Sequence, residues 1–451
     1  MEAFERGVLS HFQQLLPAHF VEQAYADAGL RHHNSLYAPV VVLWLLVLQR
    51  IEGGAPLGAA VLEMLRGLPT EFWPRPCKRM RDWRQHGKAP SSHTGAYNQA
   101  RQALPLAVVQ KCCDRIFQEL ISQLKPSSSG SSRRAFLIDG SSMRMAHSPE
   151  LCRQYPAGTN QHGGGHWPVL KIVVAHDLYT GLAMRPEWGP MYGPGAVSEQ
   201  RLLELAIERL PAGAIVIGDS NFGVFSVGWA AAQRQYPVLV RLTVPRAQRL
   251  ARGALRDGTD RPVVWKPSAY ERTAHPELPP DAELAGRLIV RQMQPGNGGK
   301  PFLLALFTTL PDAQKEILEL YSQRWKVETD LRTLKSNLKL DQFTCLTADM
   351  VAKEIEMAMA AYNLVRAVIC QASEQSGVPP RGYSFTQVQR IVQTFGPLLE
   401  AAEDAGEAKK VFDQMMRYIQ QAKLPLHRKR PTYPRAVWQR GAYFPSRQSK
   451  K

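Results

Sequence analysis

The sequence predicts an α/β protein in which helical regions flank a mixed sheet on both sides. Residues 135–242 contain short apolar runs that alternate with helical patterns, as in a mixed sheet. Residues 1–125 and 349–422 instead carry apolar side chains at helical spacing. Residues 243–310 are rich in Gly, Pro and short β-like runs, which indicates a β-rich insertion.

Composition and charge narrow the class of protein. The chain has 451 residues, of which 44% are hydrophobic and 21% charged, so it is neither disordered nor fibrous and can bury a large core. It contains 56 Lys and Arg against 39 Asp and Glu, a net charge of +17. Such a surplus favours a polyanionic partner, either nucleic acid or an acidic membrane surface.

The apolar patterns argue against a membrane protein. The longest apolar run, residues 36–48, is shorter than the ~20 residues of a spanning helix and has a Pro near its start, so we expect a buried helix. The first residues, MEAFERGV, show no export signal. Six cysteines without a CxxC pair indicate reduced thiols in a cytoplasmic protein rather than disulfides or a zinc site.

The chain divides at changes of pattern. Residues 1–125 form a helical region that carries a basic stretch containing Arg79, Arg81 and Arg84, for which a solvated loop is the alternative interpretation. Residues 126–134 include the linker-like run PSSSGSS. The expected parts that follow are the first part of the core (135–242), the insertion (243–310), a long helix over 311–338 within a last core segment (311–345), and a helical region with a basic tail (346–451).

Two carboxylates occupy the same predicted place. Asp139 ends the apolar run 135–138, and Asp219 follows the run 214–217. A carboxylate at the carboxyl end of a strand projects into the crevice where α/β sheets bind ligands. Asp-Gly and Asp-Ser are also common turn pairs, so ordinary turn residues are the alternative.

The long helix adds a polar stripe. At 100° per residue, Tyr321, Arg324, Glu328 and Lys335 lie within roughly 60° of one another, beside the apolar face of the helix. Such a stripe lines a groove, whereas Asp330 lies on the other flank and is a poorer site candidate. A surface ion pair between Arg324 and Glu328 is the alternative.

The segment YSQRWKVETDLRTLK matches the spacing Y-x2-R-x3-E-x6-K. It resembles the signature of DDE transposases of bacterial insertion sequences, in the family named for insertion sequence four. Segments LYAPVVVLWLLVLQ, SSHTGAYNQARQALP and RPTYPRAVWQRGAYFPSR also resemble one branch of that family, so the likeness spans nearly the whole chain. The resemblance implies a ribonuclease H-like core with a β-rich insertion before the last catalytic helix.

The resemblance also implies a function and its catalytic residues. The protein would bind terminal inverted repeats and catalyse cut-and-paste strand cleavage and strand transfer with hairpin ends. Asp139, Asp219 and Glu328 would be the catalytic metal ligands, with Asp139 bridging two Mg²⁺ ions, for which Mn²⁺ can substitute. Hard oxygen ligands suit Mg²⁺, and paired ions stabilise the entering and leaving oxygens of a phosphodiester.

Other residues would contact DNA. Arg324 and Lys335 suit phosphates near the scissile bond, and Tyr321 can bond to phosphate or stack on a base. Trp325, on the far flank, either contacts DNA or packs against another domain. The N-terminal helices would read the transposon end through a basic segment that includes Arg79, Arg81, Arg84 and Arg101, with the basic tail adding affinity and a dimer acting on paired ends.

The exact function and the aromatic residue that would stack on a flipped base stay open at this stage. A related metal-dependent nuclease, or a degenerate transposase acting as a DNA-binding repressor, are the competing functions. Some relatives place a Trp shortly before the signature Tyr to stack on a flipped base, but no Trp lies between Lys266 and Arg324. Trp265 and Phe302 are the nearest aromatic substitutes. We expect a bacterial cytoplasmic protein associated with the nucleoid.

Overall fold

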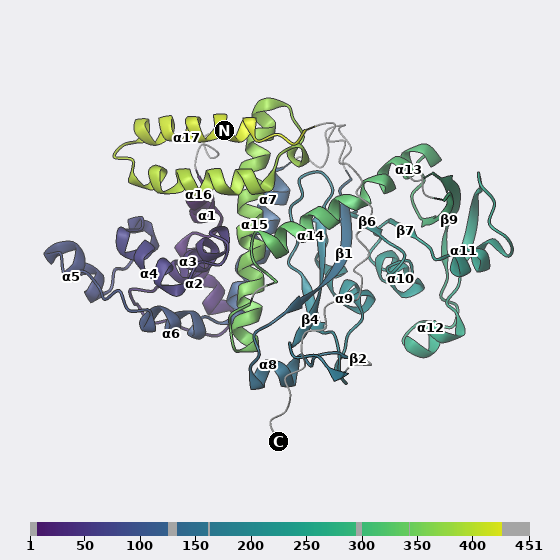
Figure 1. Cartoon of the computed structure of the whole chain (residues 1–451), viewed down its shortest axis with the longest axis horizontal. Helices are drawn as coiled ribbons and strands as arrows, with labels where there is room; N and C mark the ends of the chain where they lie inside the picture. The colour runs from purple at the N-terminus through teal and green to yellow at the C-terminus, as the bar shows by residue number, and fades with distance from the viewer. Residues whose placement is uncertain (1–6, 125–132, 161–162, 295–299, 342, 426–451) are drawn as a thin grey trace, which may run out of the picture.

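The computed structural model describes residues 7–124, 133–160, 163–294, 300–341 and 343–425. The expected linker at 126–134 lies largely outside these residues, as does the basic tail from 426 onward. Within them, helices surround one large mixed sheet, as predicted (Figure 1).

The region before the sheet is helical, as the apolar spacing predicts. The long apolar run forms α3, which is buried along nearly its whole length. In the described part of the chain, no helix combines the length and apolarity needed to cross a membrane. The elements are α1 (Val8–Leu15), α2 (Ala18–Asp27), α3 (Pro39–Ile51), α4 (Leu57–Arg66), the 3-10 helix η2 (Thr70–Phe72), α5 (Lys78–His86), α6 (Gly95–Ala103) and α7 (Leu106–Gln123).

The described residues form an eight-stranded sheet in the order β5-β4-β1-β6-β7-β10-β9-β8. The long strand β1 runs parallel to β6 on one side and antiparallel to β4 on the other. β6 is also parallel to β7, which confirms the mixed sheet. The first five strands in that order are β5 (Glu187–Pro190), β4 (Val169–Asp177), β1 (Ala135–Arg144), β6 (Ile215–Gly218) and β7 (Val238–Arg241).

The β-rich insertion continues the core sheet instead of forming a sheet of its own. Strand β10 pairs antiparallel with β7, and β9 and β8 extend the sheet from there. Trp265 at the end of β8 is buried against Phe225 and Phe307, so it belongs to the sheet core. The segment comprises α11 (Val244–Ala251), β8 (Asp260–Trp265), α12 (Ala269–Ala274), β9 (Leu284–Met293) and β10 (Phe302–Thr308).

Helices alternate with the strands of the core, as predicted for residues 135–242. The edge strand β5 is short and begins at Glu187. The sequence did not predict α8 (Pro149–Gln154) or the small ribbon of β2 (Thr159–Asn160) and β3 (Gly163–Gly164). The predicted helices are α9 (Glu199–Ala206), its 3-10 extension η3 (Ile207–Arg209), and α10 (Phe225–Ala232).

The prediction of one long helix over 311–338 is wrong. The structure has α13 (Gln314–Ser322), a 3-10 turn η4 (Gln323–Trp325) and α14 (Lys326–Ser336). A 3-10 turn advances about 120° per residue instead of 100°, so three residues rotate the helix by roughly 60° beyond the α-helical expectation. The angles expected for Glu328 and Lys335 relative to Tyr321 therefore do not hold, although all of them lie on this segment.

Helix α15 (Ala348–Ser376) forms the spine of the molecule. It is buried over most of its length and packs against α7, α3 and α14 (Figure 1). Gly377, with φ +70°, ends it. The chain continues through η5 (Pro380–Gly382), α16 (Phe385–Ala401) and α17 (Ala405–Gln421).

Candidate active site

Asp139 and Asp219 follow the paired segments of two neighbouring parallel strands, β1 and β6. Leu137 of β1 pairs with Ile217 of β6, and each aspartate follows two residues later on its own chain. The prediction that the first strand stops at Asp139 is wrong, because β1 continues to Arg144 along β4. Pairing with β6 does end there, so Asp139 stands where the two parallel strands separate.

Strand alternation directs the two aspartates toward helices α13 and α14. Successive side chains on a strand point to opposite faces, so Asp139 faces the same way as Leu137, and Asp219 the same way as Ile217. Leu137 and Ile217 belong to a separate core cluster that also contains Tyr321 and Val327. The carboxylates therefore point to the face of the sheet that α13 and α14 cover.

The environment of Asp139 disfavours its charged form. Its pKa is raised to about 6, chiefly by burial and in part by the nearby carboxylates of Asp219 and Glu199, while the Gly140 N–H and the charge of Arg324 oppose the shift. The Gly140 N–H donates to Asp139 Oδ1 at 2.8 Å. A positive ion beside these carboxylates would relieve their repulsion, and their oxygens are the ligands that Mg²⁺ prefers.

Tyr321 and Arg324 are buried next to the aspartates. Burial raises the pKa of Tyr321 to about 12, although Arg324 and Arg241 oppose the shift. The phenol therefore stays neutral at pH 7 and can donate a hydrogen bond. Arg324 lies over the Trp325 ring, 4.4 Å from its centroid, and pairs with Glu328 at 3.6 Å. Trp325 itself is 62% exposed, so its outer face is open to solvent.

Glu328 and Lys335 occupy opposite ends of α14. Lys335 Nζ donates to Ser141 Oγ at 3.1 Å and to the Ser142 carbonyl at 3.0 Å, which ties α14 to the strand of Asp139. The Glu328 side chain is 43% exposed. Among the described residues, no group of three or more His, Cys, Asp or Glu side chains is arranged to hold a metal, so Glu328 does not join the aspartates in this arrangement.

Comparison with known proteins agrees with this geometry. A family model for the transposase DDE domain matches residues 130–364, which include the two aspartates and the helices opposite them. The chain belongs to the DDE transposase family. It is also 24% identical to the transposase InsG for insertion sequence element IS4 of Escherichia coli (strain K12), over 98% of this chain and 94% of that protein. The resemblance to the insertion sequence four family is thereby confirmed.

The transposase has a further carboxylate near the aspartates that the sequence did not single out. Glu199 begins α9, and its carboxylate accepts a hydrogen bond from the Asn221 amide. The Asn221 backbone N–H in turn donates to Asp219 Oδ1 at 2.8 Å. An acid directly after the capping residue Ser198 is typical of any helix start, so the sequence carried no signal for this position.

The predicted basic residues of the N-terminal region differ in exposure. Arg79, Arg81 and Arg84 lie exposed on α5, where Arg84 is 5.8 Å from the centroid of the Trp73 ring. Arg101 is buried instead and pairs with Glu354 of α15 at 3.3 Å. In this arrangement Arg101 joins α6 to α15, whereas the arginines of α5 are available to a partner.

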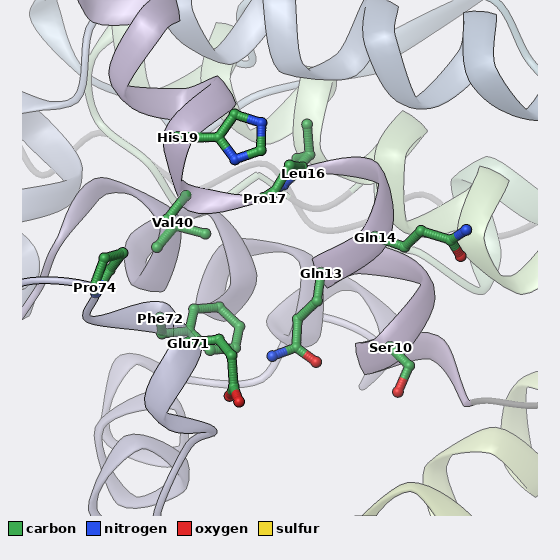
Figure 2. Close-up of a pocket in the computed structure, with 11 residues that line it drawn as sticks. Ser10, Gln13, Gln14, Leu16, Pro17, His19, Val40, Glu71, Phe72 and Pro74 are labelled. Carbon is green, nitrogen blue, oxygen red and sulfur yellow. The ribbon is translucent and has the colours of Figure 1, made fainter. Parts of the chain in front are cut away.

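A pocket of about 900 Å³ lies away from the aspartates, among α1, α2 and η2 (Figure 2). Gln13, Glu71 and Phe72 are among the residues that line it. Its lining includes none of the residues predicted for the site, which are Asp139, Asp219, Tyr321, Arg324, Glu328 and Lys335. The pocket therefore lies apart from the two aspartates.

Proposed function

We propose that this transposase cleaves DNA at the ends of an insertion sequence and joins the freed 3′ ends to target DNA, with Asp139, Asp219 and Glu328 as its catalytic carboxylates. The observation that supports the proposal best is the placement of Asp139 and Asp219, each two residues after the last paired residues of β1 and β6, Leu137 and Ile217. The helix that carries Glu328 is bonded to the same strand through Lys335.

The carboxylates would hold divalent metal ions, Mg²⁺ or Mn²⁺. Bound ions of this kind align a nucleophile and stabilise charge on the entering and leaving oxygens of a phosphodiester. The Asp219 carboxylate contributes, after burial, to the raised pKa of Asp139, so a cation between the two carboxylates would be favourable. Glu328 would exchange its ion pair with Arg324 for a place beside the aspartates.

The cations and aromatic side chains around the carboxylates would hold the DNA. Release of Glu328 leaves the Arg324 guanidinium free to pair with a phosphate, a contact that orients DNA without reading its sequence. Lys335 would bind a second phosphate from its place beside Ser141. Trp325 and Phe302 are partly exposed and could stack on a base or sugar. Trp265 is excluded from that role by its burial.

Recognition of the transposon ends is assigned to the N-terminal helices. Arg79, Arg81 and Arg84 are exposed on α5, where Arg81 and Arg84 leave the helix about 60° apart and Arg79 leaves it on another side. An exposed basic helix suits docking along DNA. Arg101 is left out of this surface because it is buried against Glu354. A dimer on paired ends, hairpin intermediates and the added affinity of the basic tail complete the proposal.

The test is a cleavage and joining assay with the full-length protein and a duplex that carries the terminal repeat of its element. Wild type should nick the duplex with Mg²⁺ or Mn²⁺ and join the freed ends to a plasmid. Asp139→Asn, Asp219→Asn and Glu328→Gln should each abolish nicking and retain binding in a gel shift. Glu187→Gln, a carboxylate on β5 that pairs with Arg209, is the matched control and should nick normally. Near-normal nicking by a triad variant would remove that residue from the site.

A further inference from the structure

Asp330 is a buried carboxylate on the helix that carries Glu328. It lies two residues after Glu328 on α14, and at 100° per residue the two side chains leave the helix on nearly opposite sides. Asp330 Oδ1 accepts from Arg366 Nη2 at 2.9 Å and from the Tyr362 hydroxyl at 3.2 Å. Its Oδ2 accepts from Arg381 Nη1 at 2.7 Å. The oxygens of Asp330 are thus engaged away from the catalytic face.

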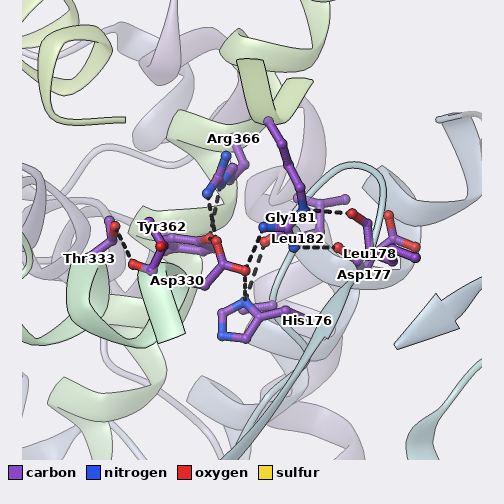
Figure 3. Close-up of polar contacts among 12 residues, drawn as sticks. His176, Asp177, Leu178, Gly181, Leu182, Asp330, Thr333, Tyr362 and Arg366 are labelled. Carbon is purple, nitrogen blue, oxygen red and sulfur yellow. Dashed lines mark hydrogen bonds and ion pairs between the residues drawn. The ribbon is translucent and has the colours of Figure 1, made fainter. Parts of the chain in front are cut away.

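The cluster around Asp330 joins three separate parts of the chain (Figure 3). Tyr362 and Arg366 come from α15, and Arg381 comes from η5. Arg381 also donates to the backbone carbonyls of Asp177 and Leu178, at the turn that follows β4. The catalytic helix, the C-terminal region and the core sheet therefore meet at one carboxylate.

The turn after β4 leaves room for Arg366 because it has a glycine at position 181. Gly181, in the turn after β4, has φ +78°, and a Cβ there would lie 2.9 Å from Arg366 Cζ. Asn363 of α15 pairs with the Ala183 backbone in both directions at 2.8 Å. The turn and α15 are therefore locked together, so Arg366 has a fixed position from which to hold Asp330.

Two arginines face the Asp330 carboxylate from separate elements. Arg366 Nη2 lies 2.9 Å from Oδ1, and Arg381 Nη1 lies 2.7 Å from Oδ2. His176, whose Nδ1 is 4.0 Å from Oδ2, has a pKa lowered to about 4 by burial and is neutral at pH 7. The arginines therefore provide the positive charge that faces Asp330 near neutral pH.

We propose that Asp330 is a positioning residue, which fixes the rotation of α14 so that Glu328 and Lys335 face the strand of Asp139. Because α14 is rigid, bonds that hold Asp330 on one side of the helix also fix the direction of Glu328 and Lys335 on the other side. Lys335 already reaches β1 from this orientation. This inference rests on the proposed role of Glu328 as a catalytic carboxylate, and it makes α15 and η5 part of the catalytic unit.

The chain offers a matched control for Asp330. Glu354 on α15 is also buried and also binds a pair of arginines, Arg50 and Arg101. That cluster joins α15 to α3 and α6. Its Arg50 also donates to the carbonyls of Leu338 and Lys339, which lie beyond the end of α14, and no hydrogen bond or ion pair of Glu354 itself reaches residues 326–336. Glu354→Gln and Asp330→Asn both remove a buried charge with little change of shape, so a general loss of stability should affect both variants. An effect on the metal site should affect Asp330→Asn alone.

The experiment compares full-length wild type, Asp330→Asn and Glu354→Gln at a temperature where circular dichroism shows all three folded. Cleavage of end DNA is titrated with Mg²⁺, and end binding is measured without divalent metal. Asp330→Asn should raise the Mg²⁺ concentration for half-maximal cleavage by about tenfold, the usual scale for losing a residue that orients a metal ligand, and should bind ends normally. Glu354→Gln should keep the wild-type Mg²⁺ requirement. An unchanged Mg²⁺ requirement in Asp330→Asn would overturn the proposal.

Hydrogen exchange provides a readout that does not depend on activity. Exchange in residues 326–336 should rise in Asp330→Asn and stay at the wild-type level in Glu354→Gln. If wild type does not cleave with Mg²⁺ or Mn²⁺, the proposed function fails, whereas the exchange comparison still tests whether Asp330 holds α14. If Asp330→Asn does not fold, Arg381→Lys replaces it, because it keeps the charge and loses the fork that reaches Asp177 and Leu178. Equal exchange and an equal Mg²⁺ requirement in that variant would also overturn the proposal.

Discussion

The carboxylate of Glu199 occupies the space that a side chain at Gly140 would need. A Cβ built on Gly140 would lie 2.5 Å from Glu199 Oε1 and 2.4 Å from its Cδ. The residue directly after Asp139 therefore controls where a neighbouring carboxylate can lie. Glu199 is in turn connected to Asp219 through Asn221.

Gly140→Ala should therefore mimic the loss of Glu199. Gly140→Ala and Glu199→Ala should each lower the rate of end cleavage by about tenfold, because both changes free Asn221 from its partner and loosen the turn at Asp219. The double variant should lose no more than either single variant, since the same interaction is removed once. Full activity of Gly140→Ala, or multiplicative losses in the double variant, would contradict this coupling.

The raised pKa of Asp139 predicts that the metal-free protein gains stability when this charge is removed. The folded state binds the proton at a pKa of about 6, above the ordinary value of 3.8, so stability falls as pH rises from about 4 to about 6 and the full loss is present above pH 6. Asp139→Asn should raise the Tm in EDTA at pH 7.5 by about 1–3 °C. The gain in Tm over wild type should shrink between pH 6 and pH 4 and vanish below pH 4. A Tm for Asp139→Asn below that of wild type at pH 7.5 would contradict the prediction.

Metal binding should show the opposite dependence on pH. Mn²⁺ requires the Asp139 carboxylate, so its affinity should fall as pH drops through about 6, and by about tenfold between pH 7.5 and pH 5. Electron paramagnetic resonance of free Mn²⁺ measures this without DNA. Asp139→Asn should bind Mn²⁺ weakly throughout and lose this step in the profile. A wild-type affinity that is constant from pH 5 to pH 7.5 would argue against Asp139 as a ligand.

Exposed and buried arginines of the N-terminal region should behave differently. Arg79→Ala, Arg81→Ala and Arg84→Ala should weaken end binding and reduce the slope of log affinity against log salt by about 0.9 for each lost phosphate contact. Arg101→Ala should instead lower the free energy of unfolding by roughly 2–4 kcal/mol, because it removes one partner of the buried Glu354. Gel shifts over a salt series and urea melts separate the two effects.

Arg75, which lies before α5, provides a control for the variants of Arg79, Arg81 and Arg84. Arg75→Ala removes an exposed arginine that pairs with Glu22, and it should leave both end binding and stability near wild type. If Arg101→Ala weakened end binding as much as the α5 variants and left the urea midpoint unchanged, Arg101 would belong to the DNA surface after all.

Arg324→Ala and Lys335→Ala should impair handling of DNA and not the binding of metal. A charged guanidinium or ammonium cannot ligate Mg²⁺, and both side chains lie near the strand of Asp139. Each variant should slow cleavage of a radiolabelled end by ten- to a hundredfold, with the strongest defect at any hairpin step, where crowded phosphates need cationic support. Complete rescue of either variant by high Mg²⁺ would show that the residue acts through the metal site.

The sequence predicted the strand-end carboxylates because local signals determine them. Apolar runs of strand length placed Asp139 and Asp219, and the structure pairs the two strands in parallel. The break between α13 and α14 could not be predicted in this way. The 3-10 turn contains the buried Arg324, whose charge acts on Asp139 from a distant part of the chain, and a local pattern carries no signal for such a contact.

Burial of charged groups was the other feature that the sequence could not provide. Arg101 resembles any basic residue of a DNA-binding helix until Glu354, more than 250 positions later, is placed beside it. Asp330 likewise looks like an exposed residue on the flank of a helix. Its partners Arg366 and Arg381 come from segments whose own patterns predict only helices and a turn. Long-range pairing of charges leaves no periodic trace in a sequence.

The central position of α15 also has a consequence for the synthesis of this protein. Helices α3 and α7, made early, bury their apolar faces against a helix that spans Ala348–Ser376, so a nascent chain cannot complete its first core until the ribosome has passed that segment. The same segment fixes Asp330, so a chain interrupted before residue 381 would have neither a finished helical region nor an oriented catalytic helix. Formation of the working enzyme is in this way coupled to translation of its C-terminal part, and α3, one of the most apolar helices in the fold, needs protection from aggregation until then.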